Sequence, residues 1–556
     1  MSLLRRLVPL VFLVFPAVSG PALDFWDKTP DDLLATALVA AMSPGELASQ
    51  VIMVAFPEPQ PDAAIRQWAA EMGLGGIKFF GWNAASPESV ATAVVTLQAE
   101  SQRTRWRIPL LVATDQEGGW VRHIKGATST SPGNLALGAS RLPWDAWRTG
   151  QLLGTELREM GVNMNFAPSV DLYTNPDSTV IGPRSFSADP LEAGVLGAAF
   201  FRGLASVGVI ATAKHFPGHG NTADDSHGKL PVLQDTLEVL TKRELVPYRL
   251  LIAEGLPAIM SGHLAFPKIS GNDLPASLSP QLIEGLLRRD LGFRGVVITD
   301  DLLMEGARPG DLSISQAALQ ALMAGNDLLL ISKPLSAQLE ARHLLVATAA
   351  SNPAVMDRLR ESARRVLLLK LRQLKGPKAV PLNPTPAKLQ LPTAGAAEYF
   401  LQSTARAATL LAGKDLPWST AGPLLVVTPY EGALPALGLR FPAARALPYE
   451  YRFTGFDPDF RAALVARAPS EGRLVFVLAV PGAMAYLKAL EPWKEKLAVI
   501  SLLSPVYLRE VPWVRNAVAV YGTNAAAFEV AAAVLAGDFA PRGVLPLKLS
   551  PVAEVP

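Results

Sequence analysis

In Val209-Ile210-Ala211-Thr212-Ala213-Lys214-His215-Phe216-Pro217-Gly218-His219-Gly220, an apolar stretch runs directly into a polar loop that glycine interrupts. The apolar part has the continuous pattern of a strand buried on both faces. The loop continues to His227 and holds three of the six histidines of the chain and two carboxylates. In α/β proteins the loops after the carboxyl ends of strands carry chemistry. We therefore expect a functional site at 214–227, with the rest of the chain as its scaffold.

Seven other apolar runs of strand length share this pattern, and helix-length segments such as 90–99 and 282–289 separate them. Continuous apolar runs of this kind are typical of parallel strands covered by helices on both faces. Eight such units within about 350 residues predict a (β/α)₈ barrel, with an open doubly wound sheet as the alternative. The eight predicted strands are 51–56, 77–80, 110–114, 164–167, 209–213, 258–260, 296–299 and 328–331.

Polar residues stand at the ends of five successive predicted strands. They are Asp115, Asn165, Lys214 with His215, His263, and Asp300. Any one of them could cap a helix, but parallel strands bring their carboxyl ends to the same face, so all five should converge. This convergence predicts one site at the carboxyl end of the barrel.

Composition limits the functional classes. The chain has 556 residues, 49% of them apolar, and this length predicts more than one domain. A net charge of +2, without a basic cluster, argues against nucleic acid as a partner. The chain has no cysteine, which excludes disulfides, thiolate catalysis and cysteine-bound metal.

The N-terminus has the pattern of an export signal. Arg5 and Arg6 precede an apolar run from 7 to 15, and small residues follow Pro16 up to Gly20. The run is too short for a permanent transmembrane helix, although an uncleaved anchor is the alternative. We expect a signal peptide at 1–20, a periplasmic or extracellular mature protein, and no stable membrane insertion after cleavage.

A proline-rich stretch divides the mature chain. Five prolines lie between 377 and 392, where neither helical nor strand periodicity is present, and this predicts a stiff linker at 376–392. The barrel domain is then 21–375. Residues 393–556 alternate predicted strands at 424–427, 474–479, 498–502 and 517–520 with helices such as 528–535, which predicts a smaller α/β sandwich domain.

Six motifs follow one another along the barrel. They are Asp115-Gln116-Glu117-Gly118-Gly119; Asn165-Phe166-Ala167-Pro168 with Val170-Asp171-Leu172; Val180-Ile181-Gly182 with Arg184-Ser185-Phe186; Lys214 to Gly220 with Asp225-Ser226-His227; Ser261-Gly262-His263; and Thr299-Asp300-Asp301-Leu302 with Met304-Glu305-Gly306-Ala307. In type and order they resemble the β-N-acetylglucosaminidase branch of glycoside hydrolase family 3. The C-terminal segment resembles the second domain of that family more weakly.

The resemblance implies three catalytic residues. Asp300 would be the carboxylate nucleophile of a retaining reaction, with Asp301 the less favoured neighbour. His227 would be the acid and base, oriented by Asp225, because residues i and i+2 of an extended loop project to the same side. Asp224 could compete for the imidazole, and a loop histidine bound to aspartate for order alone is the alternative.

Substrate-binding positions also carry over. Asp115, Arg184, Lys214 and His215 would hold hydroxyl groups of the terminal sugar, although Lys214 could instead be a buried ion-pair partner. The family usually has arginine at the positions of Trp120 and His123, the second of which helps to hold the sugar. We expect His123 to bind substrate, and Arg122 beside it need not point the same way. His263 could line the cleft or be a hydrogen-bonded core histidine.

The resemblance predicts an enzyme, a glycoside hydrolase without cofactor or metal, that releases terminal N-acetylglucosamine from peptidoglycan fragments or chitin-like oligosaccharides. Alternatives are a phosphorylase, a β-glucosidase of the same family and a non-catalytic glycan-binding protein. His215, His219 and His227 are zinc ligand types, but Pro217 and Gly218 prevent a shared helical face for the first two. The oligomeric state is left open.

Overall fold

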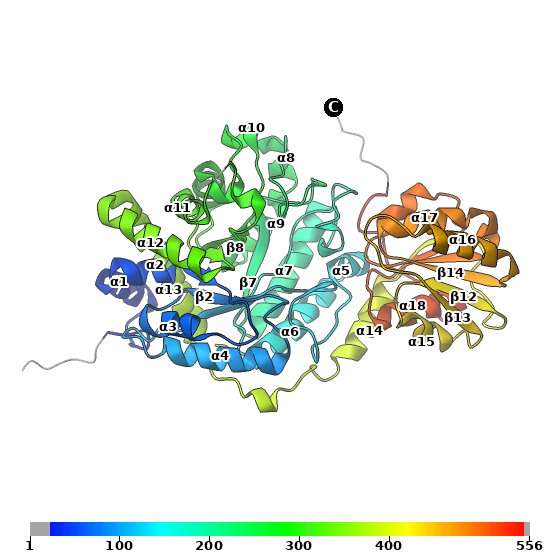
Figure 1. The fold of residues 1–556 in the computed structure, drawn as a ribbon, viewed down its shortest axis with the longest axis horizontal. Coiled ribbons are helices and arrows are strands. Elements are labelled where there is room, and N and C mark those ends of the chain that lie inside the picture. The colour runs from blue at the N-terminus through cyan, green and yellow to red at the C-terminus, as the bar shows by residue number, and fades with distance from the viewer. Residues whose placement is uncertain (1–22, 311, 550–556) are drawn as a thin grey trace, which may run out of the picture.

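The structure, a computed structural model, describes residues 23–310 and 312–549 and has two α/β parts connected through α14 (Ala396–Ala407) (Figure 1). The predicted signal peptide at 1–20 lies outside the described residues. Within those ranges, no helix is both long and apolar enough to cross a bilayer.

Eight parallel strands form the first sheet in the order β10-β1-β2-β3-β6-β7-β8-β9. A parallel bridge between Ile298 and Leu328 joins its two ends, so the sheet is nearly closed and the predicted barrel is confirmed. Every predicted strand is found. The strands are β1 (Ile52–Val54), β2 (Gly76–Phe79), β3 (Leu111–Thr114), β6 (Met164–Asn165), β7 (Ile210–Phe216), β8 (Ala258–Ser261), β9 (Val296–Thr299) and β10 (Leu329–Ile331).

Helices surround the barrel, and several of them begin at residues whose side chains satisfy free backbone N–H groups. Ser43 and Ser313 each form a capping box, and Asp189 accepts hydrogen bonds from the first turn of α7. The covering helices are α1 (Asp31–Ala41), α2 (Pro44–Gln50), α3 (Ala63–Glu71), α4 (Pro87–Ser101), α5 (Asn134–Ser140), α6 (Pro143–Glu159), α7 (Pro190–Ser206), α8 (Leu237–Lys242), α9 (Leu245–Ala253), α10 (Pro267–Ser270), the π-helix η3 (Gln281–Asp290), α11 (Ile314–Ala324), α12 (Leu335–Ser351) and α13 (Pro353–Leu374).

The second sheet has six strands in the order β11-β16-β15-β14-β12-β13, with β11 antiparallel to the rest. The four central strands match the sequence prediction, and the edge strands β11 and β13 were not predicted. The strands are β11 (Thr409–Gly413), β12 (Leu424–Thr428), β13 (Ala444–Pro448), β14 (Arg473–Leu478), β15 (Leu497–Ser501) and β16 (Asn516–Ala519); the helices are α15 (Ala433–Gly438), α16 (Pro458–Arg467), α17 (Met484–Ala489) and α18 (Ala525–Ala536).

The two parts touch directly at loops that flank the carboxyl end of the barrel. Asn524 donates a 3.0 Å hydrogen bond to the carbonyl of Thr130, and the hydroxyls of Tyr173 and Ser504 are 2.9 Å apart. The carbonyl of Pro546 accepts hydrogen bonds from Ala188 N at 2.8 Å and Ser187 Oγ at 3.0 Å. The second domain therefore supports the barrel loops that precede and follow Arg184.

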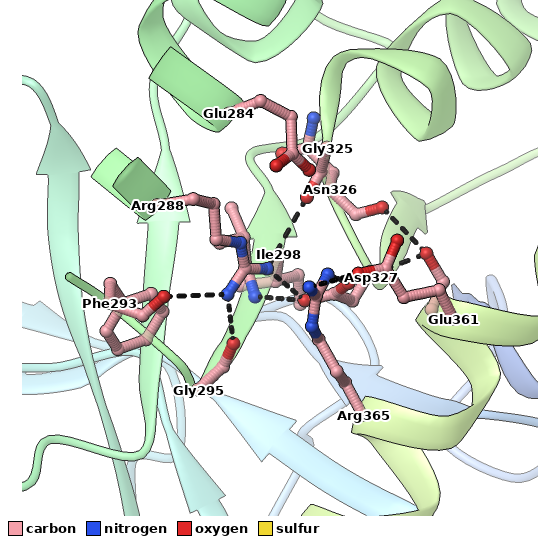
Figure 2. Close-up of polar contacts among 12 residues, drawn as sticks. Glu284, Arg288, Phe293, Gly295, Ile298, Gly325, Asn326, Asp327, Glu361 and Arg365 are labelled. Atoms are coloured by element: carbon pink, nitrogen blue, oxygen red, sulfur yellow. Dashed lines mark hydrogen bonds and ion pairs between the residues drawn. The ribbon is translucent and has the colours of Figure 1, made fainter. Parts of the chain in front are cut away.

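A buried ionic cluster lies at the opposite, amino end of the barrel strands (Figure 2). Asp327, just before β10, contacts Arg288 of η3 and, at 2.7 Å and 3.1 Å, Arg358 and Arg365 of α13. The same carboxylate accepts a 3.0 Å hydrogen bond from Val297 N of β9. This amino-end cluster ties two strands to the helices that cover them.

Candidate active site

Asp115 directly follows β3 and lies in a group of buried charges. Its carboxylate contacts Lys214 of β7, and its Oδ2 is 2.8 Å from Lys78 Nζ of β2 and 3.5 Å from His123 Nδ1. Burial alone would raise the pKa of Asp115, but Lys214, Lys78 and His123 hold that pKa well below its usual range. Asp115 is therefore an ionised hydrogen-bond acceptor at neutral pH.

Glu117 is a second carboxylate of the group and contacts Arg184 and Lys214. Arg184 donates two hydrogen bonds to it, at 2.7 Å and 2.9 Å, and Lys214 Nζ is 2.7 Å away. Burial would raise the pKa of Glu117, but Arg184 and Lys214 lower it. Lys214 thus bridges Asp115 and Glu117 and is the buried ion-pair partner considered from the sequence. Its contact with sugar, and that of Arg184, stay predictions.

Asp171 fixes the histidine at the end of β7. Its Oδ2 lies 2.6 Å from His215 Nδ1, and the backbone N–H of His219 donates to its Oδ1 at 2.7 Å. The pKa of Asp171 is lowered against the effect of burial, mainly by His215. Because Asp171 holds Nδ1, Nε2 of His215, 3.3 Å from an Arg184 nitrogen, is the ring atom turned to the charged group.

Asp300 follows β9 and is differently placed. Among the described residues its carboxylate joins no ion pair and accepts one hydrogen bond, from Asp301 N at 2.8 Å. Burial opposes ionisation, yet the nearby His215, His263 and Lys78 lower the pKa of Asp300 to about 2. The group is therefore a carboxylate at neutral pH with its oxygens uncommitted to any protein cation.

Asp225 and His227 lie together on an exposed loop. His227 Nδ1 is 2.7 Å from Asp225 Oδ1, which also accepts the His227 N–H at 2.9 Å. The side chain of His227 is 69% exposed and that of Asp225 is 49% exposed, in contrast to the buried charges around Asp115. The competitor Asp224 binds Lys229 instead, at 2.7 Å. Asp225 thus leaves Nε2 of His227 as the nitrogen available for proton transfer.

This loop connects to the segment that carries Asp300. The N–H of Gly306, in the 3₁₀ turn η4 (Glu305–Ala307) after β9, donates to the carbonyl of Ser226 at 3.1 Å. The hydroxyl of Ser226 is in turn 3.2 Å from His219 Nε2. No direct contact joins His227 to Asp300 within the described residues, so the structure brings their segments together but not the two side chains.

Comparison with known proteins decides the family of this site. Residues 45–369 match the model of the glycosyl hydrolase family 3 N terminal domain, which is more than half of the chain. The chain belongs to glycosyl hydrolase family 3. It is therefore an enzyme of the glycoside hydrolase class.

Its relatives in the family place it in the β-hexosaminidase branch. A beta-hexosaminidase from Nitrosomonas eutropha is 36% identical over 264 residues, covering 46% of this chain and 73% of the relative. Beta-hexosaminidase A from Pseudoalteromonas piscicida is 35% identical over 248 residues, 42% of each chain, so this chain spans less than half of that relative. The solved family 3 beta-N-acetylglucosaminidase from Paenibacillus sp. str. FPU-7 has 31% identity and a TM-score of 0.84, covering 92% of this chain and all (100%) of that one.

Two positions depart from the family motif. Trp120 is exposed. His123 is 3.4 Å from the carbonyl of Phe79, and burial lowers its pKa although Asp115 raises it, so the imidazole is neutral at neutral pH. Arg122 turns elsewhere and donates to the carbonyls of Thr128 and Ser129. No arginine of this segment therefore takes the place of the family arginines at positions 120 and 123.

His263 proves to be a hydrogen-bonded core histidine. Its Nδ1 is 2.8 Å from the hydroxyl of Ser277, and its Nε2 is 3.1 Å from the carbonyl of Asp301. Asn165 is also structural, since its amide clamps both backbone groups of Gln116 at 3.0 Å. Within residues 23–310 and 312–549, no group of three acidic or histidine side chains has an arrangement suited to a metal ion.

Three charged members of the site were not selected from the sequence. Glu117 and Asp171 lie inside the family motifs, yet their partners Arg184 and His215 are 67 and 44 residues away. Lys78 lies in an otherwise apolar strand. That position is the one feature of the sequence that could have marked it as a member of the site. A charge in the middle of a doubly buried strand needs a partner, and here that partner is Asp115.

Proposed function

We propose that this chain is an exported, retaining exo-β-N-acetylglucosaminidase. The observation that carries the mechanism is the environment of Asp300, a carboxylate with a pKa lowered to about 2 that forms no ion pair with any described residue. Such a group can bond to the anomeric carbon of a sugar while neighbouring charges hold the hydroxyls. The acetylated sugar is proposed because the relatives above are a beta-N-acetylglucosaminidase and beta-hexosaminidases.

In the proposed first step, Asp300 attacks the anomeric carbon and the glycosidic bond breaks. The leaving oxygen takes a proton from Nε2 of His227, and Asp225 stabilises the imidazolium through Nδ1. In the second step His227 removes a proton from water, whose oxygen displaces Asp300 and restores the original anomeric configuration. Asp115, Arg184, Lys214, His215 and His123 are proposed to orient the hydroxyls of the sugar.

Export and a peptidoglycan or chitin-like substrate rest on sequence alone. The signal-like residues 1–20 support secretion, and a terminal N-acetylglucosamine outside the cytoplasmic membrane is supplied by cell-wall fragments or chitin-like chains. N-terminal sequencing of the protein recovered from the periplasm or medium tests the first point. A free N-terminus near residue 21 is expected, and recovery only from the cytoplasm would contradict export.

The reaction is tested with paired aryl β-glycosides, one of N-acetylglucosamine and one of glucose. We expect a strong preference for the acetylated sugar, loss of turnover in Asp300→Ala, and a β-configured first product in a proton NMR time course. Adding phosphate separates hydrolysis from phosphorolysis, because only a phosphorylase forms a sugar phosphate. Preference for glucose would indicate a β-glucosidase, and no turnover on either sugar would favour a binding protein.

A further inference from the structure

Lys78 is a buried ammonium group that no motif explains. It lies on β2 with only 4% of its surface exposed, and Nζ is 3.5 Å from the centroid of the Phe80 ring. The ring of Phe80 is stacked with that of Trp82, at 4.0 Å, and with that of His123, at 5.7 Å. The aromatic stack therefore fixes the ammonium through a cation–π contact and also holds His123.

Lys78 is a second lysine beside Asp115. Lys214 and Arg184 already match the two carboxylates Asp115 and Glu117. Lys78 adds a third positive charge to the site, where the further carboxylates are Asp171, which is bound to His215, and Asp300, which joins no ion pair among the described residues. The field of Lys78 is accordingly one of the causes that lower the pKa of Asp300.

Lys78 and His123 meet on a single oxygen atom. Oδ2 of Asp115 is 2.8 Å from Lys78 Nζ and 3.5 Å from His123 Nδ1. Position 123 is where the family motif has an arginine that helps to hold the sugar, and here it carries a neutral imidazole. Compared with the family motif, the arginine at position 123 is therefore missing beside Asp115. A different cation, Lys78 on β2, contacts the same carboxylate.

We propose that Lys78 is a substrate-binding residue that supplies, from β2, the positive charge that the family motif supplies from position 123. An ammonium has three N–H donors, and one is directed to Asp115. A second donates to a hydroxyl group of the terminal sugar next to Asp115. This inference rests on the proposed function for the identity of the sugar, but not for the presence of a sugar site.

The test is a double-mutant cycle of Lys78→Met, His123→Arg and both together. Lys78→Met should lower kcat/KM for the aryl N-acetylglucosaminide and the affinity for free N-acetylglucosamine by about 10- to 100-fold. His123→Arg alone should also weaken both, because it places two cations on one oxygen. The double variant should recover at least about tenfold relative to Lys78→Met, since one cation is again present.

Lys370→Met is the matched control. Lys370 is equally buried on α13, where it donates to Gln50 Oε1 at 2.9 Å and to the carbonyl of Leu74 at 3.3 Å. Removal of the Lys370 ammonium should change the melting temperature but leave KM and the affinity for sugar unchanged. Calorimetric binding of N-acetylglucosamine and glucose gives a readout even for a protein without turnover, so failure of the proposed function is seen separately.

Several outcomes would overturn the assignment. Unchanged sugar affinity in Lys78→Met would show that the ammonium does not touch substrate. A loss in Lys78→Met that His123→Arg does not reverse, in variants with unaltered melting curves, would make Lys78 a structural partner of Asp115. Absence of any monosaccharide binding by the unmodified protein would also contradict it.

Discussion

Each end of the barrel holds a cluster of buried charge, but the two clusters are satisfied in different ways. At the amino end, Asp327 receives three arginines, and Arg288 also donates to the carbonyl of Gly295 (Figure 2). At the carboxyl end, the charges come from β2, β7, the residues that follow β3 and the loop of Arg184, and among the described residues no cation pairs with Asp300.

The difference separates stability from chemistry. A buried carboxylate with all its partners contributes to holding strands and helices in place, and removing any member leaves unpaired charge. A buried carboxylate kept ionised by charges that do not bind it is poised for a ligand, at some cost in stability. Both ends contain buried aspartate together with arginine, so position and pairing distinguish the two roles.

The strongest test of this comparison is Asp300→Asn. We expect kcat/KM to fall by about 10⁴-fold or more, because the amide cannot form the glycosyl intermediate. The melting temperature should stay the same or rise, since a desolvated charge without an ion-pair partner is removed. Steady-state kinetics and calorimetry on the same preparation measure both. A marked fall in melting temperature would place Asp300 with the structural carboxylates.

Asp327→Asn should have the opposite profile. Three guanidinium groups would lose their shared carboxylate, and the free energy of unfolding should drop by about 3–5 kcal/mol. At a temperature where the variant is folded, kcat/KM should match that of the unmodified protein. Asp538→Asn, which removes an exposed partner of Arg440 on the second domain, is the control and should melt almost normally. Equal stability of the two variants would refute the structural role.

His227→Ala should affect substrates unequally. For an alkyl N-acetylglucosaminide, whose leaving group needs a proton, kcat/KM should fall by about 10²-fold or more, whereas an activated aryl glycoside should lose much less. The quantity to compare is kcat/KM, which reports glycosidic bond cleavage and not release of the intermediate. Asp224→Ala, on the same loop, should change neither value. Equal losses for both leaving groups would argue against His227 as the acid.

Lowering the pH should destabilise the folded protein through a histidine at the site end of the barrel and not through the amino-end cluster. Burial and the nearby His215 lower the pKa of His219 from 6.5 to about 4. Between these two pH values the imidazole is protonated in the unfolded chain and neutral in the folded protein. Stability therefore falls as pH drops through 6.5, by about 2 kcal/mol between about pH 7 and pH 5.

His219→Asn should flatten this part of the curve of melting temperature against pH. The exposed His343→Asn should leave its slope unchanged, and so should Asp327→Asn, whose cluster contains no histidine. If His219→Asn retained the full acid sensitivity, another group would have to bind the proton.

The sequence predicted those parts of the fold that depend on local pattern. All eight barrel strands are mainly apolar and buried, and so are the four central strands of the second sheet. The edge strands β11 and β13 escaped prediction because each is short and largely exposed or half-buried, and neither is a continuous apolar run. Edge strands do not need the apolar composition that made the others recognisable.

The contacts of the site also differ in how far they depend on local sequence. The contact between Asp225 and His227 spans two residues, and the sequence pattern was enough to anticipate it. The contact of Lys214 with Asp115 spans 99 residues, so the ion pair becomes visible only when the barrel brings β3 and β7 together. The partners of Arg184 and Lys78 belong to this second kind, and only the family motif had marked Arg184.

The contacts made by Pro546 have a consequence for the order in which the protein is built. Its carbonyl completes the hydrogen bonding of Ser187 and Ala188, close to the arginine that binds Glu117. A ribosome makes the barrel strands first and Pro546 long afterwards. The segment around Arg184 therefore gains these hydrogen bonds only after Pro546 has been made, and catalytic competence is expected to mature only then.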